Sequence, residues 1–279
     1  VDFEIVPVET KGDRMLDVSL DKLGDKGFFT KELETALLNR EVDFVVHSMK
    51  DLPTGIPEGL VIAAVTKRHD PRDVIISRDN LTFARLPAGA RVGTSSLRRK
   101  SQLLHARPDI VLLDMRGNVD TRIKKMETGD YDAIVLAAAG VERLGCQDLI
   151  TEKLDCSICL PAPGQGALGI ETRAGDKEIM EMVRKVNDPA TERCVLAERS
   201  LLRSLEGGCR APVGALAVVR GGSFVLEAVV AGTDGSVLVR DALAGDLPAA
   251  EELGEKLASI LLERGAAEIL KRIRREHVS

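Results

Sequence analysis

Short apolar runs alternate with amphipathic stretches through the first two thirds of the chain, and this pattern limits the possible folds more than any other feature. Such alternation is typical of βαβ units. Most of the runs lack the apolar/polar alternation of a half-exposed strand, as expected where both faces of a parallel sheet are covered. The runs are EIVPV near Ile5, DFVVH from Asp43 to His47, LVIAAV from Leu60, IVLLD from Ile110 and AIVLAAAG from Ala133. The sequence therefore predicts an α/β body.

The pattern changes at about Thr191. A long helical stretch reaches Leu205, and the strand-like runs VGALAVV, FVLEAVVAG and SVLVRDALAG follow it. RGGS and TDGS join these runs, and their Gly-Gly and Asp-Gly pairs are hairpin signals. Two amphipathic helices, the first from Pro248, then close the chain. We expect an antiparallel α+β domain attached to the α/β body.

Arginines lie next to a short Gly/Ser/Asn turn twice, in GTSSLRRK from Gly93 to Lys100 and in RGNVDTRIKK from Arg116 to Lys125. The segment 91–125 holds nine Lys or Arg and three Asp, a net charge of +6 in a chain of net charge −5. The guanidinium fork matches a carboxylate, and backbone N–H groups at a turn that opens a helix also bind anions. The segment predicts a site for several carboxylates or phosphates, with a solvated helix face as the alternative.

Composition limits the classes of partner. The acidic balance, the absence of Trp and the single Tyr disfavour single-stranded nucleic acid, which is bound by basic grooves with stacking aromatics. The chain has no apolar run long enough to span a membrane, and its first residues do not resemble a signal peptide. We therefore expect a cytoplasmic protein that binds neither nucleic acid nor membrane. The odd number of cysteines, five, fits reduced thiols better than disulfides.

The motif HSMKDLP, from His47 to Pro53, directly follows a strand-like run. Loops at the carboxyl ends of parallel strands are where α/β proteins bind ligands, so Lys50 and Asp51 are candidates for chemistry. A plain turn with surface charges is the alternative. His47 could act as a general acid, although a histidine hydrogen-bonded to backbone at a strand end is more common.

Two glycine-rich motifs follow later in the chain. In APGQGALGIE, from Ala162 to Glu171, Gln165 could bind a ligand or the backbone that crosses between domains, and a purely structural hinge is the alternative. In LEGGCRAP, the two glycines leave the Cys209 thiol accessible as a nucleophile or attachment point. A lone cysteine at such a place is more often inert.

The CSIC motif, from Cys156 to Cys159, could indicate zinc or redox chemistry. No second cysteine pair accompanies it, and none of the four histidines lies at zinc-finger spacing. We predict an ordinary loop here and no metal site.

The motifs HSMKDLP, DPRD from Asp70, GTSSLRR, RGNVDTR, DAIVLAAAG, PGQGA and GGCRAP occur in this order over most of the chain. This set closely resembles the hydroxymethylbilane synthases, also called porphobilinogen deaminases. The resemblance implies an α/β fold with two lobes like those of type II periplasmic binding proteins, joined by crossing hinge strands, and a C-terminal α+β domain with a small antiparallel sheet. The expected domains are residues 1–66 with 167–186, residues 67–166, and residues 187–279.

The resemblance also implies a reaction. Members of the family link four porphobilinogen molecules head to tail, release ammonia and free linear hydroxymethylbilane, a step of porphyrin and heme biosynthesis. The thiol that matches Cys209 carries a dipyrromethane cofactor through a thioether. The carboxylate that matches Asp51 accepts hydrogen bonds from pyrrole N–H groups and stabilises the cationic azafulvene formed when ammonia leaves, which is electrostatic preorganisation.

The remaining site residues follow from the same resemblance. Those expected to bind the cofactor besides Cys209 are Ser48, Lys50, Thr94, Ser96, Arg98 and Arg99. Those expected to bind substrate are Arg116, Arg122, Arg143, Gln165, Lys22, Lys26 and Phe29, the last three in a loop that covers the cleft in the family. Each pyrrole carries an acetate and a propionate group, so a growing chain needs many carboxylate receptors.

One departure concerns the start of the chain. The family begins with a strand and a helix that include an ATRxS-like turn, and this sequence starts after them, so we expect it to be a trimmed form of a longer protein whose first domain lacks that unit. The resemblance implies a monomer. Two alternatives from other classes are a noncatalytic two-lobed protein that binds a polycarboxylate, in which Cys209 and Asp51 would have no task, and an anion-steered nucleic-acid binder.

Overall fold

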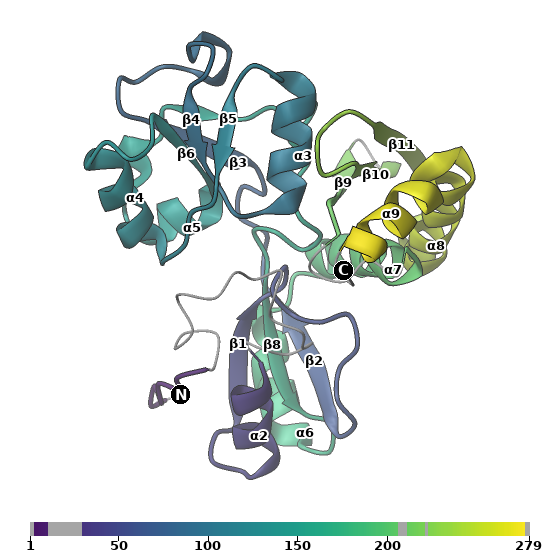
Figure 1. Ribbon diagram of the computed structural model, residues 1–279. Helices are drawn as coiled ribbons and strands as arrows, with labels where there is room; N and C mark the ends of the chain where they lie inside the picture. The colour runs from purple at the N-terminus through teal and green to yellow at the C-terminus, as the bar shows by residue number, and fades with distance from the viewer. Residues whose placement is uncertain (1–2, 11–29, 206–210, 221–222, 277–279) are drawn as a thin grey trace.

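A computed structural model describes residues 3–10, 30–205, 211–220 and 223–276 (Figure 1). The predicted site residues Lys22, Lys26, Phe29 and Cys209 lie outside these ranges. Three sheets divide the described chain into a first lobe, a second lobe and a C-terminal part. Figure 1 shows the two lobes at opposite ends of a narrow crossing, with the C-terminal part beside them. No helix in the described ranges is long and apolar enough to cross a bilayer.

The first lobe contains a three-stranded antiparallel sheet in the order β1-β8-β2. Its elements are β1 (Phe44–Ser48), β2 (Leu60–Val65), β8 (Leu168–Arg173), α2 (Lys31–Leu38), α6 (Lys177–Val183) and a 3₁₀ turn (Arg184–Val186). Helix α2 packs near Val45 and α6 near Phe44, so the two helices cover opposite faces. The expected parallel pairing is wrong for this sheet, because its central strand β8 comes from the far end of the body and runs against both neighbours.

The strand expected near Ile5 is also wrong. Residues 3–10 form no strand, and the Ile5 side chain is 79% exposed. An apolar run becomes a strand only where a neighbouring strand takes up its backbone hydrogen bonds, and none of the described strands pairs with this segment.

The second lobe contains a mixed five-stranded sheet in the order β5-β4-β6-β3-β7. Its elements are β3 (Asp73–Ser77), β4 (Arg91–Gly93), β5 (Val111–Leu113), β6 (Ala133–Ala137), β7 (Glu152–Lys153), α3 (Leu97–Ala106), α4 (Val119–Glu127), α5 (Ala138–Arg143) and 3₁₀ turns at Phe83–Arg85 and Gln147–Leu149. Strand β4 is parallel to β5 and β6, as predicted, whereas β3 is antiparallel to both of its neighbours. Helix α3 packs on one face, and α4 and α5 pack on the other.

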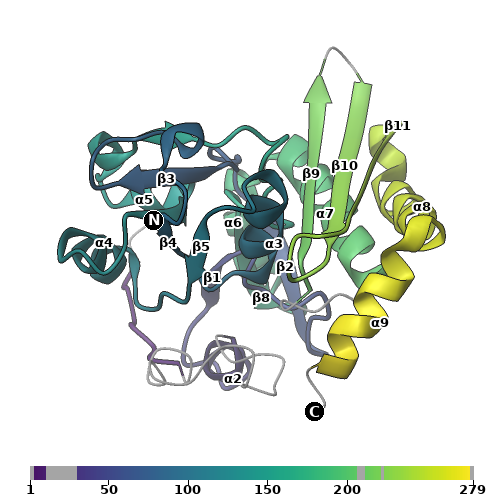
Figure 2. The same ribbon diagram turned by 45° about the horizontal axis from the view of Figure 1, so that its top comes forward.

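The C-terminal part contains the antiparallel sheet that the hairpin signals predict, in the order β11-β10-β9. Its elements are α7 (Pro189–Ser204), β9 (Val213–Arg220), β10 (Ser223–Ala231), β11 (Leu238–Gly245), a 3₁₀ turn (Leu247–Ala249), α8 (Ala250–Leu261), a π-helical turn (Leu262–Ala266) and α9 (Ala267–Glu276). Helices α7 and α8 pack together on the sheet and bury its core (Figure 2).

The chain crosses between the lobes twice, after β2 and before β8. The two crossing segments are held together by backbone hydrogen bonds, from Thr66 N to Leu168 O at 2.9 Å and from His69 N to Gly166 O at 3.0 Å. Helix α7 starts beside them, with Asp188 N donating to Val65 O at 2.8 Å. The observed architecture is therefore the expected one: two α/β lobes, a double crossing, and a C-terminal α+β part.

The close packing of α7 on α8 depends on Gly254. A Cβ atom at this position would overlap the Ala197 carbonyl oxygen and lie 2.8 Å from Leu201 N, both of them backbone atoms of α7. We expect Gly254→Ala to lower the free energy of unfolding by about 1–3 kcal/mol, because overpacking outweighs the better helix propensity of alanine. Thermal unfolding measures this. The matched control is Gly175→Ala, where a Cβ meets nothing within 4 Å; equal melting temperatures for the two variants would contradict the packing argument.

Candidate active site

Two helix N-termini lie side by side in the second lobe, after the adjacent parallel strands β4 and β5. Ser96 caps α3 by accepting a hydrogen bond from Arg99 N, and Asn118 caps α4 by accepting one from Thr121 N at 2.9 Å. The buried Thr94 hydroxyl accepts a hydrogen bond from Ser96 N at 3.3 Å and shapes the first turn. The prediction that both Gly/Ser/Asn turns open helices is confirmed. Helix N-termini at the carboxyl ends of parallel strands suit an anionic ligand.

Arg98 and Arg99, which follow the first turn, are 5% and 6% exposed and both bind Asp73, the first residue of β3. Arg98 Nη1 lies 2.6 Å from Asp73 Oδ2, and Arg99 Nη2 lies 2.7 Å from Asp73 Oδ1. Arg98 also donates to Leu160 O at 2.8 Å, and Arg99 to Val135 O at 3.0 Å. The carboxylate that these arginines hold in this structure is therefore the protein's own.

Asp73 has two further donors. Gln165 Nε2 donates to Asp73 Oδ1 at 2.9 Å, and the Cys159 thiol lies 3.3 Å from Oδ2. Burial alone would raise the pKa of Asp73, but the two arginines hold it well below its usual range. Burial also raises the pKa of Cys159 to about 12, so this thiol acts here as a hydrogen-bond donor and not as a nucleophile.

The loop that follows β1 carries Lys50 and Asp51 toward this cluster. Asp51 N donates to Ser48 O at 2.9 Å, which closes the turn, and the Asp51 side chain is exposed. Burial lowers the pKa of Lys50; Asp51 opposes this shift, and Arg99 adds to it. The loop of the first lobe therefore lies within electrostatic range of the arginines of the second lobe.

Arg122, in α4, belongs to the same group of charges. Burial, with smaller contributions from the charges of Arg99 and Arg116, lowers its pKa to about 10, and Asp51 opposes this shift. Its Nε donates to Gly117 O at 2.7 Å. Arg122 is thus a partly buried cation whose nearest charged neighbours include two other cations, an arrangement that an anionic ligand would stabilise.

The glycines of PGQGA place a second turn against the Lys50 loop. Gly164 has φ +77°, and a Cβ atom there would lie 2.8 Å from Met49 Cβ and 3.2 Å from Lys50 N. Only glycine combines this left-handed backbone with such a close approach. The neighbouring Gln165 donates to Asp73, so the motif contacts the Lys50 loop of the first lobe and the arginine cluster of the second lobe.

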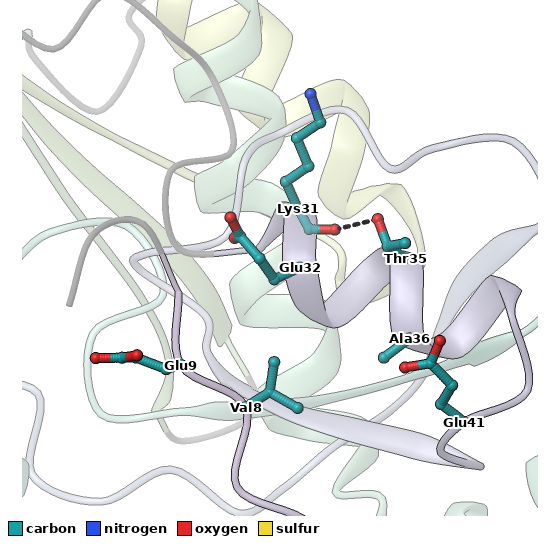
Figure 3. A pocket seen from close by; sticks show the side chains of 7 residues that line it. All are labelled: Val8, Glu9, Lys31, Glu32, Thr35, Ala36 and Glu41. Atoms are coloured by element: carbon teal, nitrogen blue, oxygen red, sulfur yellow. Dashed lines mark hydrogen bonds between the residues drawn. The ribbon is translucent and has the colours of Figure 1, made fainter. Parts of the chain in front are cut away.

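Within the described residues, Arg143 and His47 make no hydrogen bond or ion pair with the cluster. Arg143 is the exposed last residue of α5, and His47 Nε2 lies 3.1 Å from the buried Glu171 Oε2 within the first lobe. A shallow pocket of about 360 Å³ lies between residues 8–9 and α2 (Figure 3). Its lining includes Lys31 and several glutamates but none of the predicted site residues. Its position and its acidic lining make it unsuitable for carboxylate substrates.

Two buried carboxylates, Asp73 and Glu198, were not among the predicted site residues, although the sequence holds a signal for each. Asp73 opens a strand whose five residues are all buried. Glu198 lies between Cys194 and Leu201 on the apolar face of α7. A charge at a core position requires a partner, so each acid predicts a buried cation nearby.

Asp73 is the residue of this cluster on which stability depends most. Asp73→Asn leaves two buried guanidinium groups without a counter-charge, and we expect it to lower the free energy of unfolding by about 3–5 kcal/mol. Asp109→Asn removes the acid of an exposed pair with Arg107 and should change stability far less, because solvent screens that pair. Urea unfolding of both variants at neutral pH tests the contrast, and similar losses in the two would contradict it.

The acid dependence of stability provides a second measure of Asp73. Its folded-state pKa lies below the value of about 3.9 in an unfolded chain, so its contribution is complete above that value and is lost as the pH falls toward the folded-state pKa. Unfolding measured from pH 5 to pH 2 should therefore lose stability more steeply in the unmodified chain than in Asp73→Asn.

The chain is similar to known proteins along nearly its whole length. Residues 1–181 match the family model described as "Porphobilinogen deaminase, dipyromethane cofactor binding domain", and residues 192–263 match "Porphobilinogen deaminase, C-terminal domain". The porphobilinogen deaminase of Desulforudis audaxviator is 57% identical over 274 residues, which are 98% of this chain and 89% of that protein. Those of Moorella thermoacetica and Bacillus subtilis are 53% and 48% identical, over 97% and 98% of this chain and 86% and 87% of theirs.

A match among solved structures, to a mutant ArgBP from T. maritima, covers 55% of this chain and 65% of that chain at 18% identity and a TM-score of 0.30. That score is too low to support an argument about this chain. The family models together span both lobes and most of the C-terminal part, and the relatives match nearly the whole chain. The chain therefore belongs to the porphobilinogen deaminase family.

Proposed function

We propose that this chain is a hydroxymethylbilane synthase, a transferase that joins four porphobilinogen molecules head to tail with release of ammonia and then frees linear hydroxymethylbilane. The observation that carries the proposal is the approach of Lys50 and Asp51, from the first lobe, to Arg99 and Arg122 of the second lobe. An exposed carboxylate beside a group of partly buried cations suits a substrate that carries carboxylates and develops positive charge. The noncatalytic polycarboxylate-binding alternative is not favoured, because the matched relatives carry the name of an enzyme.

The charges of the site fit the dipyrromethane cofactor that the matched family model names. Among the described residues, Lys50, Arg99 and Arg122 lie within electrostatic range of one another, and Asp51 opposes their effect on the pKa values of Lys50 and Arg122. A dipyrromethane carries four carboxylates, which suit such a group of cations. When bound, it supplies the pyrrole terminus to which each new unit is joined. The residues that would hold it are Ser48, Lys50, Thr94, Ser96, Arg98 and Arg99, with Cys209 as the covalent anchor.

The substrate side of the site is assigned on the same reasoning. Arg116 and Arg122, with Arg143 and Gln165, would bind the acetate and propionate groups of the growing chain. Arg122 remains charged at neutral pH, because its pKa is lowered only to about 10. Asp51 would accept hydrogen bonds from pyrrole N–H groups and offset the positive charge that develops when ammonia leaves. Lys22, Lys26 and Phe29 are assigned from the resemblance alone.

The organisation proposed for the chain completes this assignment. Residues 1–66 with 167–186, residues 67–166 and residues 187–279 form the three domains, which agrees with the division of the described strands among three sheets. We expect a monomer, because both lobes that form the site belong to one chain. We expect it in the cytoplasm, where a small-molecule biosynthetic substrate would be used.

The cofactor assignment predicts one adduct at one cysteine. Intact-mass spectrometry of the purified protein should show the chain plus a dipyrromethane, and Cys209→Ser should show the bare chain. Cys146→Ser, the matched control, should retain the adduct. A measured mass equal to that of the chain alone, in protein that consumes porphobilinogen, would contradict the assignment. An adduct mapped to another cysteine would contradict it as well.

The role of Asp51 predicts a folded but inactive variant. Asp51→Asn keeps the size of the side chain and removes its charge, and loss of one preorganised electrostatic contact lowers turnover by about a hundredfold to a thousandfold. Porphobilinogen consumption and hydroxymethylbilane release measure this, with intact mass to check that the primer is still attached. Asp79→Asn, at an exposed loop position, is the control and should behave as the unmodified chain. Ordinary turnover by Asp51→Asn would remove Asp51 from the mechanism.

A further inference from the structure

Helix α7 of the C-terminal part contacts the loop that carries Lys50 and Asp51. Arg199 Nη1 donates to Leu52 O at 2.9 Å, and Arg199 Nη2 donates to Pro53 O at 2.5 Å. These are the first two carbonyl groups after Asp51. A planar guanidinium that donates to two successive carbonyls fixes the direction of the backbone between them.

The apolar side of the same contact comes from Val195, one helical turn before Arg199. Val195 packs with Met49 and Leu52, which are both 3% exposed. Residues four apart lie on one face of a helix, so Val195 and Arg199 form a single docking face. This face holds the residues on both sides of the Lys50–Asp51 pair and leaves the Asp51 carboxylate exposed.

The helix is itself fixed in place by the next side chain along. Glu198 accepts hydrogen bonds from Arg68 Nη1 at 2.6 Å and from Gly164 N at 2.6 Å, one donor from each crossing segment. The Gly164 turn in turn packs against Met49 and Lys50. The loop is therefore in contact with a helix and a turn that are bonded to each other.

The position of Asp51 depends on these contacts of the loop, because the Asp51 side chain makes few contacts of its own. Among the described residues, no donor is hydrogen-bonded to the Asp51 carboxylate, and its backbone N–H bonds only within the turn, to Ser48 O. The position of the carboxylate is thus set by the backbone of the loop. A displacement of about 1 Å at a reacting centre lowers the rate by about a hundredfold.

We propose that Arg199 is a positioning residue that fixes the Asp51 carboxylate for the reaction by holding the carbonyl groups of Leu52 and Pro53. The expected effect on rate rests on the proposed function. The expected effect on the loop rests on the described contacts alone. It makes the C-terminal part a contributor to the geometry of a site whose charged residues come from the two lobes.

The test compares three variants of the full chain. Arg199→Ala removes both donors, Arg199→Lys keeps the charge but not the fork, and Arg203→Ala removes the next arginine along α7, which pairs at the surface with Glu251. We expect Arg199→Ala to lower kcat by about tenfold to a hundredfold with KM changed less than about threefold, because binding groups elsewhere are intact. Arg199→Lys should recover part of the loss, and Arg203→Ala should match the unmodified chain.

Hydrogen exchange provides a readout that does not need activity. Backbone amides of residues 49–54 should exchange faster in Arg199→Ala than in Arg203→Ala, whereas those of β10 should be unchanged. Unchanged kcat and unchanged exchange in Arg199→Ala would overturn the proposal, as would an equal rise in exchange throughout the chain. Should Arg199→Ala not fold, the same two outcomes apply to Arg199→Lys. Failure of the unmodified chain to consume porphobilinogen would contradict the proposed function, and the exchange data would still decide whether Arg199 holds the loop.

Discussion

The arrangement of this protein depends on one buried carboxylate, that of Glu198, which is 0% exposed. It accepts hydrogen bonds from Arg68 Nη1 and Nη2, from Gly164 N and from Ala217 N, at 2.6, 2.8, 2.6 and 2.7 Å. These donors come from the first crossing segment, the second crossing segment and β9. Burial lowers the pKa of Arg68, but its pairing with Glu198 outweighs this and raises it. A buried charge is tolerated only when its hydrogen bonds are satisfied, so the lobes and the C-terminal part have to meet at this point.

Asp73, in the second lobe, is also a buried carboxylate whose hydrogen bonds have to be satisfied. It joins the start of β3 to the N-terminus of α3 and, through Gln165, to the second crossing segment. Glu198 and Asp73 therefore both accept hydrogen bonds from residues of the crossing segments. Lys50 and Arg122 lie near these segments with their charges only partly offset. The arginines that pair with Glu198 and Asp73 support the fold, whereas Lys50 and Arg122 are the cations that a ligand would neutralise.

The parts of the fold that sequence predicts well are those set by local chemistry. The hairpin glycines and the amphipathic pattern predict β9, β10 and β11 with their helices, and DFVVH predicts β1 with the HSMKDLP loop at its carboxyl end. The pairing in the first lobe could not be predicted in this way, because β8 inserts between β1 and β2 from more than a hundred residues away. Strand β4 has only three residues, too few for a periodic signal.

The site shows the same division between local and distant information. Sequence predicts the positive charge of the second lobe and the acid in the loop after β1, because both are local motifs. It does not predict that the Arg98 and Arg99 guanidinium groups are buried against Asp73. Asp73 is 25 and 26 residues away along the chain, and nothing near the arginines indicates that it reaches them.

The partners of Arg99 also indicate how it acts on a ligand. Its Nε and Nη2 donate to Asp73, and its Nη1 donates to Val135 O, so each of its three nitrogen atoms has a protein acceptor. Its charge nevertheless reaches the site, since it lowers the pKa of both Lys50 and Arg122. Arg99 therefore acts in this structure mainly as a fixed positive charge, whereas Lys50 and Arg122 are the groups whose charges an incoming carboxylate would offset most directly. The arginine pair in the sequence marks the location of the site, and the acids that the fold brings to it decide which cations remain for a ligand.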